Sequence, residues 1–199
     1  MEILEAIEKH QASFGLEIGP ESAAALERYY LVLQEHNELL HLVAPMSAEE
    51  FAIRHILESL TLLEHLPITA KFADVGAGAG LPSIPCLLVR GDLKAVLIES
   101  KEKKAKFLET AIESLGLLNR VKIINSQFEE ADLGDCKYVT CRALDKYTQK
   151  LPKLVKWSKQ RHLLLFGGKS LGLALQENHI ECVQYLMPLS EQRYLYVSL

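Results

Sequence analysis

Three glycines at alternate positions separate an apolar segment from a proline. Residues 72–75 have the character of a buried strand, Gly76, Gly78 and Gly80 follow, and Pro82 is placed to begin a helix. Glycine permits tight turns and lets a ligand lie against bare backbone. The first amides of the following helix favour electron-rich groups. This spacing therefore predicts a nucleotide or nucleoside pocket at the end of the strand.

Two carboxylates support this interpretation. Glu99 ends the next apolar run, 95–98, where an acid at the strand tip is placed to accept hydrogen bonds from both ribose hydroxyls. Asp74 precedes the first glycine by two positions. The G-x-G-x-G spacing differs from the G-x-G-x-x-G of dinucleotide-binding folds. Together with Asp74, it resembles the first motif of Rossmann-like methyltransferases that use S-adenosyl-L-methionine. The alternative is a tight turn beside a surface glutamate.

The elements that must position these residues alternate between strand and helix. Strands are predicted at 71–75, 94–99, 121–124, 138–141 and 162–166, with helices at 82–90, 101–115, 148–158 and 171–178. Two further strands, 180–186 and 193–198, can form an antiparallel edge. This order predicts an α/β fold of the Rossmann-like methyltransferase type, with a mostly parallel seven-stranded sheet.

Helical segments at 2–14, 21–42 and 47–66 precede the first strand. We expect residues 1–67 to form a helical N-terminal extension packed on a core of residues 68–199, in one structural unit. Ser47 and Glu50 have the spacing of a capping box at the start of the third segment. The apolar inner stripe of the second segment is predicted to contain Leu26, Tyr30, Leu33, Leu39 and Leu40.

The composition is typical of a globular domain, with 49% hydrophobic and 24% charged residues in 199. No apolar run is long enough to span a membrane, and the N-terminus does not resemble a secretory signal, so we expect a cytoplasmic protein without a membrane partner. The four cysteines have no C-x-x-C spacing and no clustered histidines, so no metal site is predicted. We expect the four cysteines to be reduced thiols, as is usual in the cytoplasm.

The net charge of −4 conceals an uneven distribution. Residues 1–70 contain three basic and twelve acidic residues, whereas residues 137–169, the basic block, contain nine basic residues and one acid. Such a block is a candidate phosphate-binding face, and a solvated surface is the equally good alternative. Four lysines (Lys101, Lys103, Lys104 and Lys106) lie near the start of one predicted helix, where the helix dipole does not favour them.

Several segments together carry a more specific resemblance. They are Asn37-Glu38-Leu39-Leu40-His41-Leu42, Arg54-His55-Ile56-Leu57-Glu58-Ser59, the glycine loop through Pro85, Leu97-Ile98-Glu99-Ser100-Lys101, Lys104, Phe107-Leu108 and Cys141-Arg142-Ala143. They resemble the bacterial glucose-inhibited division protein B (GidB, or RsmG) family. Members of that family methylate N7 of a guanine in small-subunit ribosomal RNA with S-adenosyl-L-methionine. The resemblance extends from about residue 29 to residue 169.

The resemblance implies roles for individual residues. Glu99 would hold the ribose, Phe128 and Glu129 would lie by the adenine, and Arg142 would contact both the cofactor and the incoming base as the catalytic residue. The cofactor would lie along the glycine loop, formed by Gly76, Ala77, Gly78, Gly80 and Leu81. Phe128 as a core residue and Arg142 as a surface cation are the alternatives. Ribosomal RNA or the small subunit would bind a monomer through the basic block.

Three positions depart from the family pattern. Gln127 stands where the family usually has arginine, Gly167-Gly168-Lys169 where it usually has Lys-Gly, and His41 where it favours asparagine. Each change removes or moves a contact to RNA or to the active site. Two other functions therefore stay open: a methyltransferase for a small molecule, and a regulatory module that binds the cofactor without transferring the methyl group.

The chemistry agrees with these residues. Guanine N7 carries no proton, so methylation there needs alignment rather than a general base. The planar guanidinium of Arg142 suits guanine O6 or a phosphate. A rival is attack on a pyrimidine by Cys141, although nothing near it in sequence activates the thiol. His55 either closes over the pocket or packs between helices.

Overall fold

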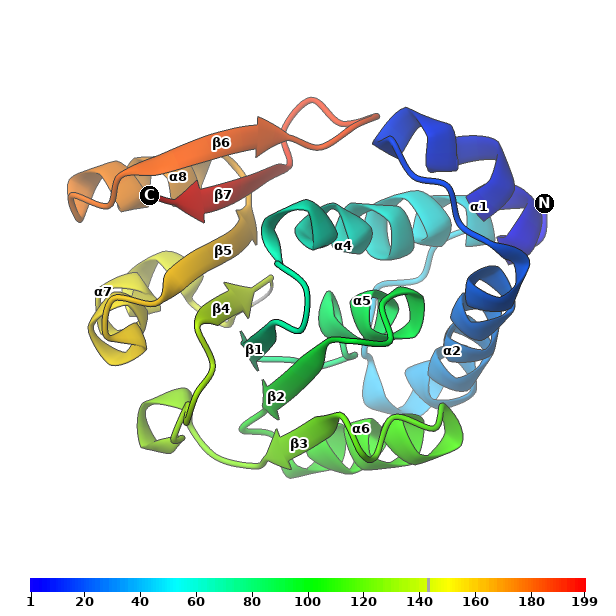
Figure 1. Cartoon of the computed structure of the whole chain (residues 1–199), viewed down its shortest axis with the longest axis horizontal. Helices are drawn as coiled ribbons and strands as arrows, with labels where there is room; N and C mark the ends of the chain where they lie inside the picture. Colours follow the sequence, from blue (N-terminus) through cyan, green and yellow to red (C-terminus); the bar gives the residue numbers. More distant parts are fainter. Residues whose placement is uncertain (143) are drawn as a thin grey trace.

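The computed structural model describes residues 1–142 and 144–199, so Ala143 of the Cys141-Arg142-Ala143 segment lies outside the described residues. Its centre is a seven-stranded sheet in the order β3-β2-β1-β4-β5-β7-β6 (Figure 1). The strands are β1 (Lys71–Val75), β2 (Lys94–Ile98), β3 (Val121–Ile124), β4 (Tyr138–Cys141), β5 (His162–Gly167), β6 (Cys182–Leu186) and β7 (Tyr194–Ser198). The first five pair in parallel, whereas β7 runs antiparallel to both β5 and β6. The predicted fold class is confirmed.

Helices cover both faces of the sheet. The core helices are α5 (Ser83–Val89), α6 (Glu102–Ser114), α7 (Tyr147–Ser158) and α8 (Lys169–Glu177), and a short turn, η4 (Phe128–Glu130), follows β3. Figure 1 shows α7 and α8 beside β5, away from α5 and α6. Side chains alternate between the two layers, as a pleated strand requires. Phe72 packs with α5 and α6, whereas Ala73 and Val75 pack with α7 and α8.

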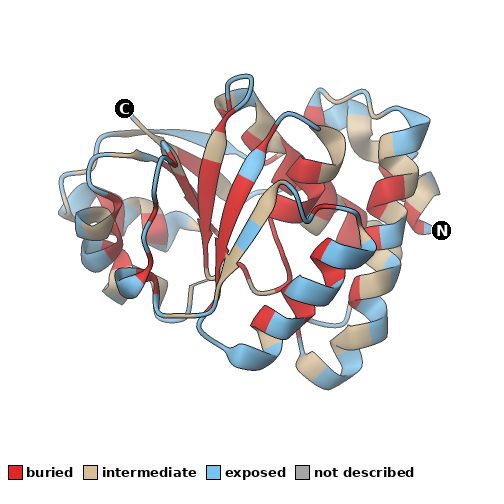
Figure 2. Ribbon diagram, turned by 60° about the horizontal axis from the view of Figure 1, so that its bottom comes forward, coloured by how far each residue is buried: buried red, intermediate tan, exposed pale blue. Residues whose placement is uncertain are grey.

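The N-terminal helices add a further layer outside α5 and α6. They are α1 (Ile3–His10), η1 (Gln11–Phe14), α2 (Pro20–Leu40), α3 (Ala48–Phe51), η2 (Ala52–Leu57), α4 (Glu58–Leu60) and η3 (Thr61–His65). Their apolar stripes join the core of that face, and Figure 2 shows buried strands inside helices whose outer surfaces are exposed. None of the helices that the structure describes has the length and apolar character needed to cross a membrane.

Two sequence-based details of this helical layer need correction. Leu39 is 84% exposed rather than part of the inner stripe, because that stripe follows Leu26, Tyr29 and Leu33, and Leu39 is rotated off it. The third segment is also not one regular helix. A π-helical turn, η2, interrupts it after α3, whose Ser47 cap does accept a hydrogen bond from the Glu50 amide.

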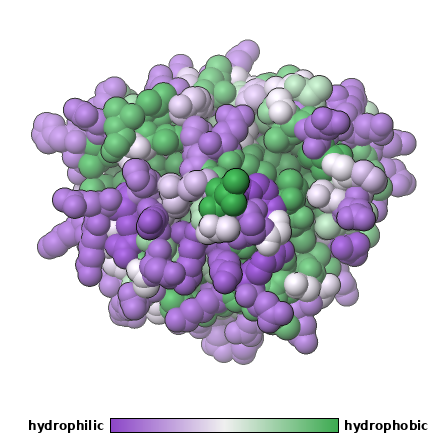
Figure 3. Space-filling model, in the orientation of Figure 1, coloured by the Kyte–Doolittle hydropathy of each residue, from purple (hydrophilic) through white to green (hydrophobic). Residues whose placement is uncertain are grey.

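The two edge strands of the sheet are β3 and β6, and β6 belongs to its antiparallel end. Figure 3 shows apolar side chains gathered over β6 and β7, on a face that also carries other apolar areas between polar ones. Val183, Tyr185 and Leu186 are the exposed apolar residues of this edge strand. The edge lies at the opposite end of the strand order from β1 and β2, which carry the glycine loop and Glu99.

Candidate active site

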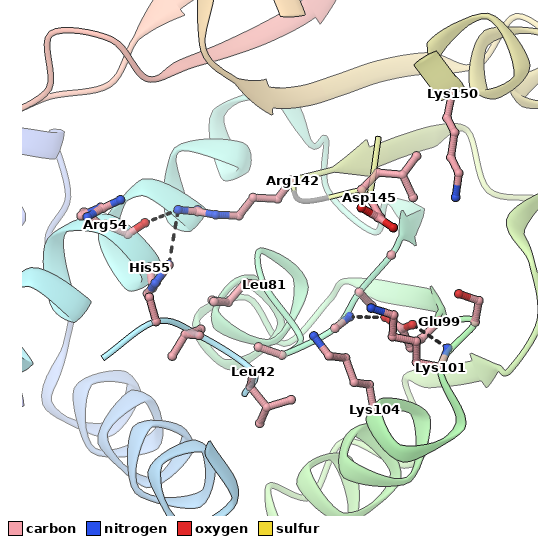
Figure 4. Close-up of a pocket in the computed structure, with 18 of the residues that line it drawn as sticks. Leu42, Arg54, His55, Leu81, Glu99, Lys101, Lys104, Arg142, Asp145 and Lys150 are labelled. Carbon is pink, nitrogen blue, oxygen red and sulfur yellow. Dashed lines mark hydrogen bonds between the residues drawn. The ribbon is translucent and has the colours of Figure 1, made fainter. Parts of the chain in front are cut away.

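A cavity of about 550 Å³ opens at the carboxyl ends of β1, β2 and β4. In α/β sheets this edge is the usual place for ligands. Two walls face each other across it (Figure 4). The loop wall consists of the glycine loop and the segment after β2, and the helical wall consists of η2 and the residues after β4. The lining residues used below are Leu42, Arg54, His55, Gly76, Ala77, Gly78, Leu81, Glu99, Lys101, Lys104, Gln127, Arg142, Asp145 and Lys150.

The glycine loop turns sharply after β1 with three left-handed residues. Gly76, Gly78 and Gly80 have φ angles of 71°, 53° and 86°, a region that residues with a Cβ rarely adopt. The amides of Gly76 and Ala77 both donate to the Ile98 carbonyl, at 2.9 and 3.1 Å, which ties the loop to β2. A Cβ at Gly80 would come within 2.3 Å of Ile84. Gly80 therefore shapes the loop without lining the cavity.

A buried tyrosine supports this loop from behind. Tyr29 on α2 is fully buried, and its hydroxyl donates to the Ala79 carbonyl at 2.9 Å. Burial raises the pKa of Tyr29, so the hydroxyl keeps the proton that it donates. Sequence reasoning missed this residue because it assigned the neighbouring Tyr30 to the inner stripe of the helix.

Glu99 links the loop to the end of β2. Its Oε2 atom accepts the Gly78 amide at 3.0 Å, and its Oε1 atom accepts the Lys101 amide at 2.8 Å. The residue is only 5% exposed but lines the cavity. Because each carboxylate oxygen has two lone pairs, both oxygens retain capacity for a hydroxyl of a ligand. The carboxylate lies at the end of the second strand, as the sequence predicts, and its contact with a diol stays a prediction.

Asp74 lies beneath the loop rather than in the cavity. It is fully buried, and one of its oxygens accepts the Ser83 hydroxyl at 2.5 Å. Its Oδ1 atom has no hydrogen-bond partner among the described residues. Burial raises the pKa of Asp74 to about 7, against the opposing hydrogen bond from Ser83. Burial therefore favours the protonated form of the acid in the glycine motif.

The helical wall is built on a buried pair of charges. Arg142 lies at the end of β4, and its Nη2 atom donates to Glu58 at 3.2 Å and also to the Arg54 carbonyl. Glu58 is 1% exposed and also accepts the Nε–H of Arg193 at 2.6 Å. Burial lowers the pKa of Arg142 from its usual value, and Glu58 opposes this shift. The carboxylate thus compensates two arginines, and sequence reasoning assigned no role to it.

The π-helical turn η2 brings two consecutive side chains to the cavity. Arg54 and His55 both line it, and His55 Nδ1 lies 3.5 Å from Arg142 Nη2. The His55 ring also packs edge-on against Phe51, with ring centroids 5.0 Å apart. Burial and the neighbouring guanidinium of Arg142 lower the pKa of His55 to about 3. His55 therefore lines the pocket as a neutral ring and packs within the helical layer, and its closing over a ligand stays a prediction.

The structure brings most of the predicted site residues together. Gly76, Ala77, Gly78, Leu81, Glu99 and Arg142 all line the cavity. Phe128 is 3% exposed and packs against Trp157 with ring centroids 5.3 Å apart, while Glu129 lies in a separate hollow beside it. Gln127 rather than these two lines the cavity. Their contact with an adenine stays a prediction.

Positive charge is concentrated around this cavity. Lys101 and Lys104 at the start of α6 line it, together with Arg54 and Lys150. The unfavourable position of these lysines relative to the α6 dipole therefore coincides with the cavity mouth. Their charge, together with that of Arg142, exceeds the negative charge of Glu99 and Asp145, the two acids in the lining.

The basic block itself is divided between two ends of the sheet. Arg142 and Lys150 lie at the cavity, whereas Lys137 and Arg161 precede β4 and β5 and so lie at the opposite edge of these parallel strands. Arg161 also donates to three backbone carbonyls, those of Gly134, Cys136 and Ser158. The nine cations of the basic block therefore do not form one continuous face.

Cys141 is enclosed in the core. It is fully buried, and burial raises its pKa to about 12. It is also not among the lining residues of the cavity. These observations favour the structural role that the sequence left open over that of a nucleophile.

Solved structures identify the class of fold. A S-adenosylmethionine-dependent methyltransferase from Aquifex aeolicus superposes with a TM-score of 0.60 at 15% identity, covering 83% of this chain and 97% of that one. The tRNA methyltransferase TrmK of B. subtilis gives a TM-score of 0.55 at 17% identity, covering 73% of this chain and 66% of that one. The fold is that of Rossmann-like methyltransferases.

Sequence comparison identifies the family. The GidB family model, described as rRNA small subunit methyltransferase G, matches residues 22–190. Proteins named ribosomal RNA small subunit methyltransferase G are similar to this chain. The one from Neisseria meningitidis is 33% identical, over 84% of this chain and 78% of its own, and the one from Sorangium cellulosum is 34% identical, over 81% and 70%. The chain belongs to the GidB family, and the resemblance predicted from sequence is confirmed.

Proposed function

We propose that this protein transfers a methyl group from S-adenosyl-L-methionine to N7 of a guanine in small-subunit ribosomal RNA. One observation carries the proposal. In a chain of the GidB family, a single cavity has the glycine loop and Glu99 on one wall and Arg142 on the other. When bound, the cofactor supplies a methyl group activated by a sulfonium centre. We also propose that the protein acts as a monomer in the cytoplasm, where an RNA substrate of this kind is available.

The loop wall fits the nucleoside part of this donor. A Cβ on Gly78 would lie 3.6 Å from the Gly76 carbonyl and 3.9 Å from Glu99 Oε2, so its absence leaves the backbone open beside the carboxylate. Glu99 would accept hydrogen bonds from the ribose hydroxyls with its remaining lone pairs. Leu81 adds an apolar surface at the same wall. A nucleoside can therefore lie on bare backbone with its sugar fixed by a charge.

The helical wall fits the acceptor base. Within the described residues, the contacts of Arg142 use Nη1 and Nη2 and leave its Nε–H without a partner. Because the arginine lines the cavity, we assign this donor to guanine O6 or to the adjoining phosphate. N7 needs no deprotonation, and the low pKa of His55 keeps that ring uncharged near the base. The wall would orient the nucleophile rather than move a proton.

The test uses small ribosomal subunits that lack the modification. They are incubated with the protein and methyl-labelled donor, and the RNA is then cleaved with borohydride and aniline at 7-methylguanine. We expect label in the small-subunit RNA and one break at a guanine. Label without a break would contradict the assignment to N7.

The two other functions give different results in this experiment. A methyltransferase for small molecules would leave the RNA unlabelled, and its activity would change little with salt. A regulatory module would bind the donor in calorimetry and transfer no methyl group. Binding of subunits by the proposed enzyme should instead weaken steeply with salt, because phosphate contacts release counterions.

A further inference from the structure

A second hollow of about 430 Å³ adjoins the helical wall of the cavity. It is lined by Arg54, Gly168, Lys169, Ser170, Gln192 and Arg193. Arg54 lines both spaces, so the two are neighbours across a single side chain. Nothing in the proposed methyl transfer uses Lys169, Ser170 or Gln192.

Three cations from three separate elements converge on this hollow. Arg54 belongs to η2, Lys169 begins α8, and Arg193 immediately precedes β7. Arg54 forms an ion pair with Glu50, and Arg193 is bonded to Glu58 through Nε. Within the described chain, Lys169 has no ion-pair partner, and the terminal nitrogens of Arg193 have no bonded acceptor.

The charges around the hollow do not cancel. Glu50 and Glu58 are the acids paired with its cations, and Glu58 is shared with Arg142 behind it. Four cations, Arg54, Arg142, Lys169 and Arg193, therefore face two carboxylates. The excess of positive charge sits in a concave surface, where it attracts an anion more strongly than a flat surface would.

The backbone at the same place is also open. Gly168 is extended, with φ −91° and ψ −172°, and it precedes α8 without a side chain that could cap the first amides. A Cβ at Gly168 would lie 3.5 Å from the Gln192 carbonyl, on the floor of the hollow. The amides and the Ser170 hydroxyl add hydrogen-bond donors to the three cations. Such a set of donors suits a group with several anionic oxygens.

A side chain at position 167 does not fit the packing of Leu171 against this loop. A Cβ at Gly167 would come within 2.9 Å of the Leu171 Cβ, so a side chain there would displace the start of α8. The cation of this loop is instead carried by Lys169, two positions later, where the side chain is exposed. The departure from the family pattern at Gly167 thus coincides with a lysine that lines the hollow.

We propose that this hollow binds a backbone phosphate of the RNA substrate, next to the nucleotide whose base enters the cavity. This inference rests on the proposed function, because it names the contact that would place the RNA relative to the donor. The bound group is a phosphodiester, recognised through its charge and oxygens and not through the base sequence. Arg54, between the two spaces, would face both the phosphate and the base.

The test compares lysines that carry the same charge. Lys169→Ala and Lys169→Glu are measured against Lys153→Ala, an exposed lysine on α7 that lines neither space. The assay is the Kd for unmethylated small subunits over a range of salt concentrations, with the Kd for the donor measured separately. We expect Lys169→Ala to raise the subunit Kd about 5- to 10-fold and to reduce the slope of log K against log salt by about 1.

Lys169→Glu should have a larger effect of the same kind, and the donor Kd should stay at the parent value in every variant. Equal effects of Lys153→Ala and Lys169→Ala would overturn the inference, since they would indicate diffuse attraction. An unchanged subunit Kd in Lys169→Glu would also overturn it. If the parent protein methylates no RNA, the proposed function fails as well. If the parent methylates RNA but substitutions of Lys169 do not change the subunit Kd, only the phosphate site fails.

Discussion

The two walls of the cavity are built on different principles. The loop wall is held by backbone geometry, with three left-handed glycines and amides bonded to β2 and to Glu99. The helical wall is held by charged side chains, in which Glu58 compensates Arg142 and Arg193. The first wall presents fixed donors and open space, and the second presents a cation whose position depends on its partners. The difference predicts that substitutions will affect donor binding at one wall and orientation of the acceptor at the other.

The largest expected effect is on stability, at the helical wall. Glu58→Gln leaves two arginines without their buried carboxylate, and breaking such a pair costs about 3–5 kcal/mol of unfolding free energy. Urea denaturation measures this loss. Glu38→Gln, an exposed change of the same type on α2, should stay within about 0.5 kcal/mol of the parent. Equal stability of the two variants would show that Glu58 is not the support of this wall.

The next effect is on turnover. Arg142→Lys keeps a positive charge beside Glu58 but loses the planar fork, so we expect kcat to fall about 10²- to 10³-fold and the donor Kd to change much less than kcat. Single-turnover methylation of small subunits measures the rate. Arg28→Lys, an exposed change on α2, controls for the substitution itself. A rate near that of the parent in Arg142→Lys would remove the arginine from the acceptor site.

At the loop wall the effect should appear in donor affinity. Glu99→Gln removes a charge that accepts hydrogen bonds, which is equivalent to about 1.5–3 kcal/mol, or about a 10- to 100-fold rise in the donor Kd by calorimetry. Glu129→Gln is the comparison, because Glu129 lies in a separate hollow. An unchanged donor Kd in Glu99→Gln would contradict the role of this carboxylate. A rise in the donor Kd with Glu129→Gln would show that the adenine end of the site extends to η4, as the family resemblance predicts.

The smallest effect is a dependence of stability on pH that has opposite signs at the two walls. Asp74 keeps its proton up to about pH 7, whereas the unfolded chain releases it near pH 4, so this group lowers stability as pH rises between these values. His55 stays neutral down to about pH 3, whereas the unfolded chain takes up a proton below about pH 6.5. His55 therefore lowers stability as pH falls below 6.5.

Variants separate these two contributions. Between pH 4.5 and 6.5, urea denaturation of Asp74→Asn should show stability rising with pH by up to about 1.4 kcal/mol per unit more than in the parent. His55→Gln should shift the slope by a similar amount in the other direction. Slopes equal to that of the parent in both variants would contradict the burial of these two groups.

The loop wall could be predicted from the sequence because its determinants are local. The spacing of Gly76, Gly78 and Gly80, with Glu99 at the next strand end, specifies both the turn and the carboxylate that it meets. The mostly parallel sheet with its antiparallel edge follows from the same alternation of strand and helix, whereas the strand order is known only from the structure. Short stretches of sequence determine these features, so they can be predicted from a single sequence.

The helical wall could not be derived in the same way. Glu58 meets Arg193 from the far end of the chain, and neither residue stands in a pattern that signals the contact. The π-helical turn η2 changes the register of the helix, and periodicity predicts only a regular one. Tyr29 was missed for a related reason, because helical periodicity alone does not decide whether Tyr29 or the adjacent Tyr30 faces the core. Long-range charge pairing and irregular helix geometry lie outside what sequence spacing encodes.

The central claim is that the donor lies on the loop wall with its reactive end toward Arg142. A crystal structure with S-adenosylhomocysteine, the demethylated product, tests this claim most directly. We predict that both ribose hydroxyls lie within hydrogen-bond distance of the Glu99 carboxylate and that the sulfur atom faces the helical wall. A nucleoside bound away from Glu99, or a sulfur atom directed away from Arg142, would contradict the account.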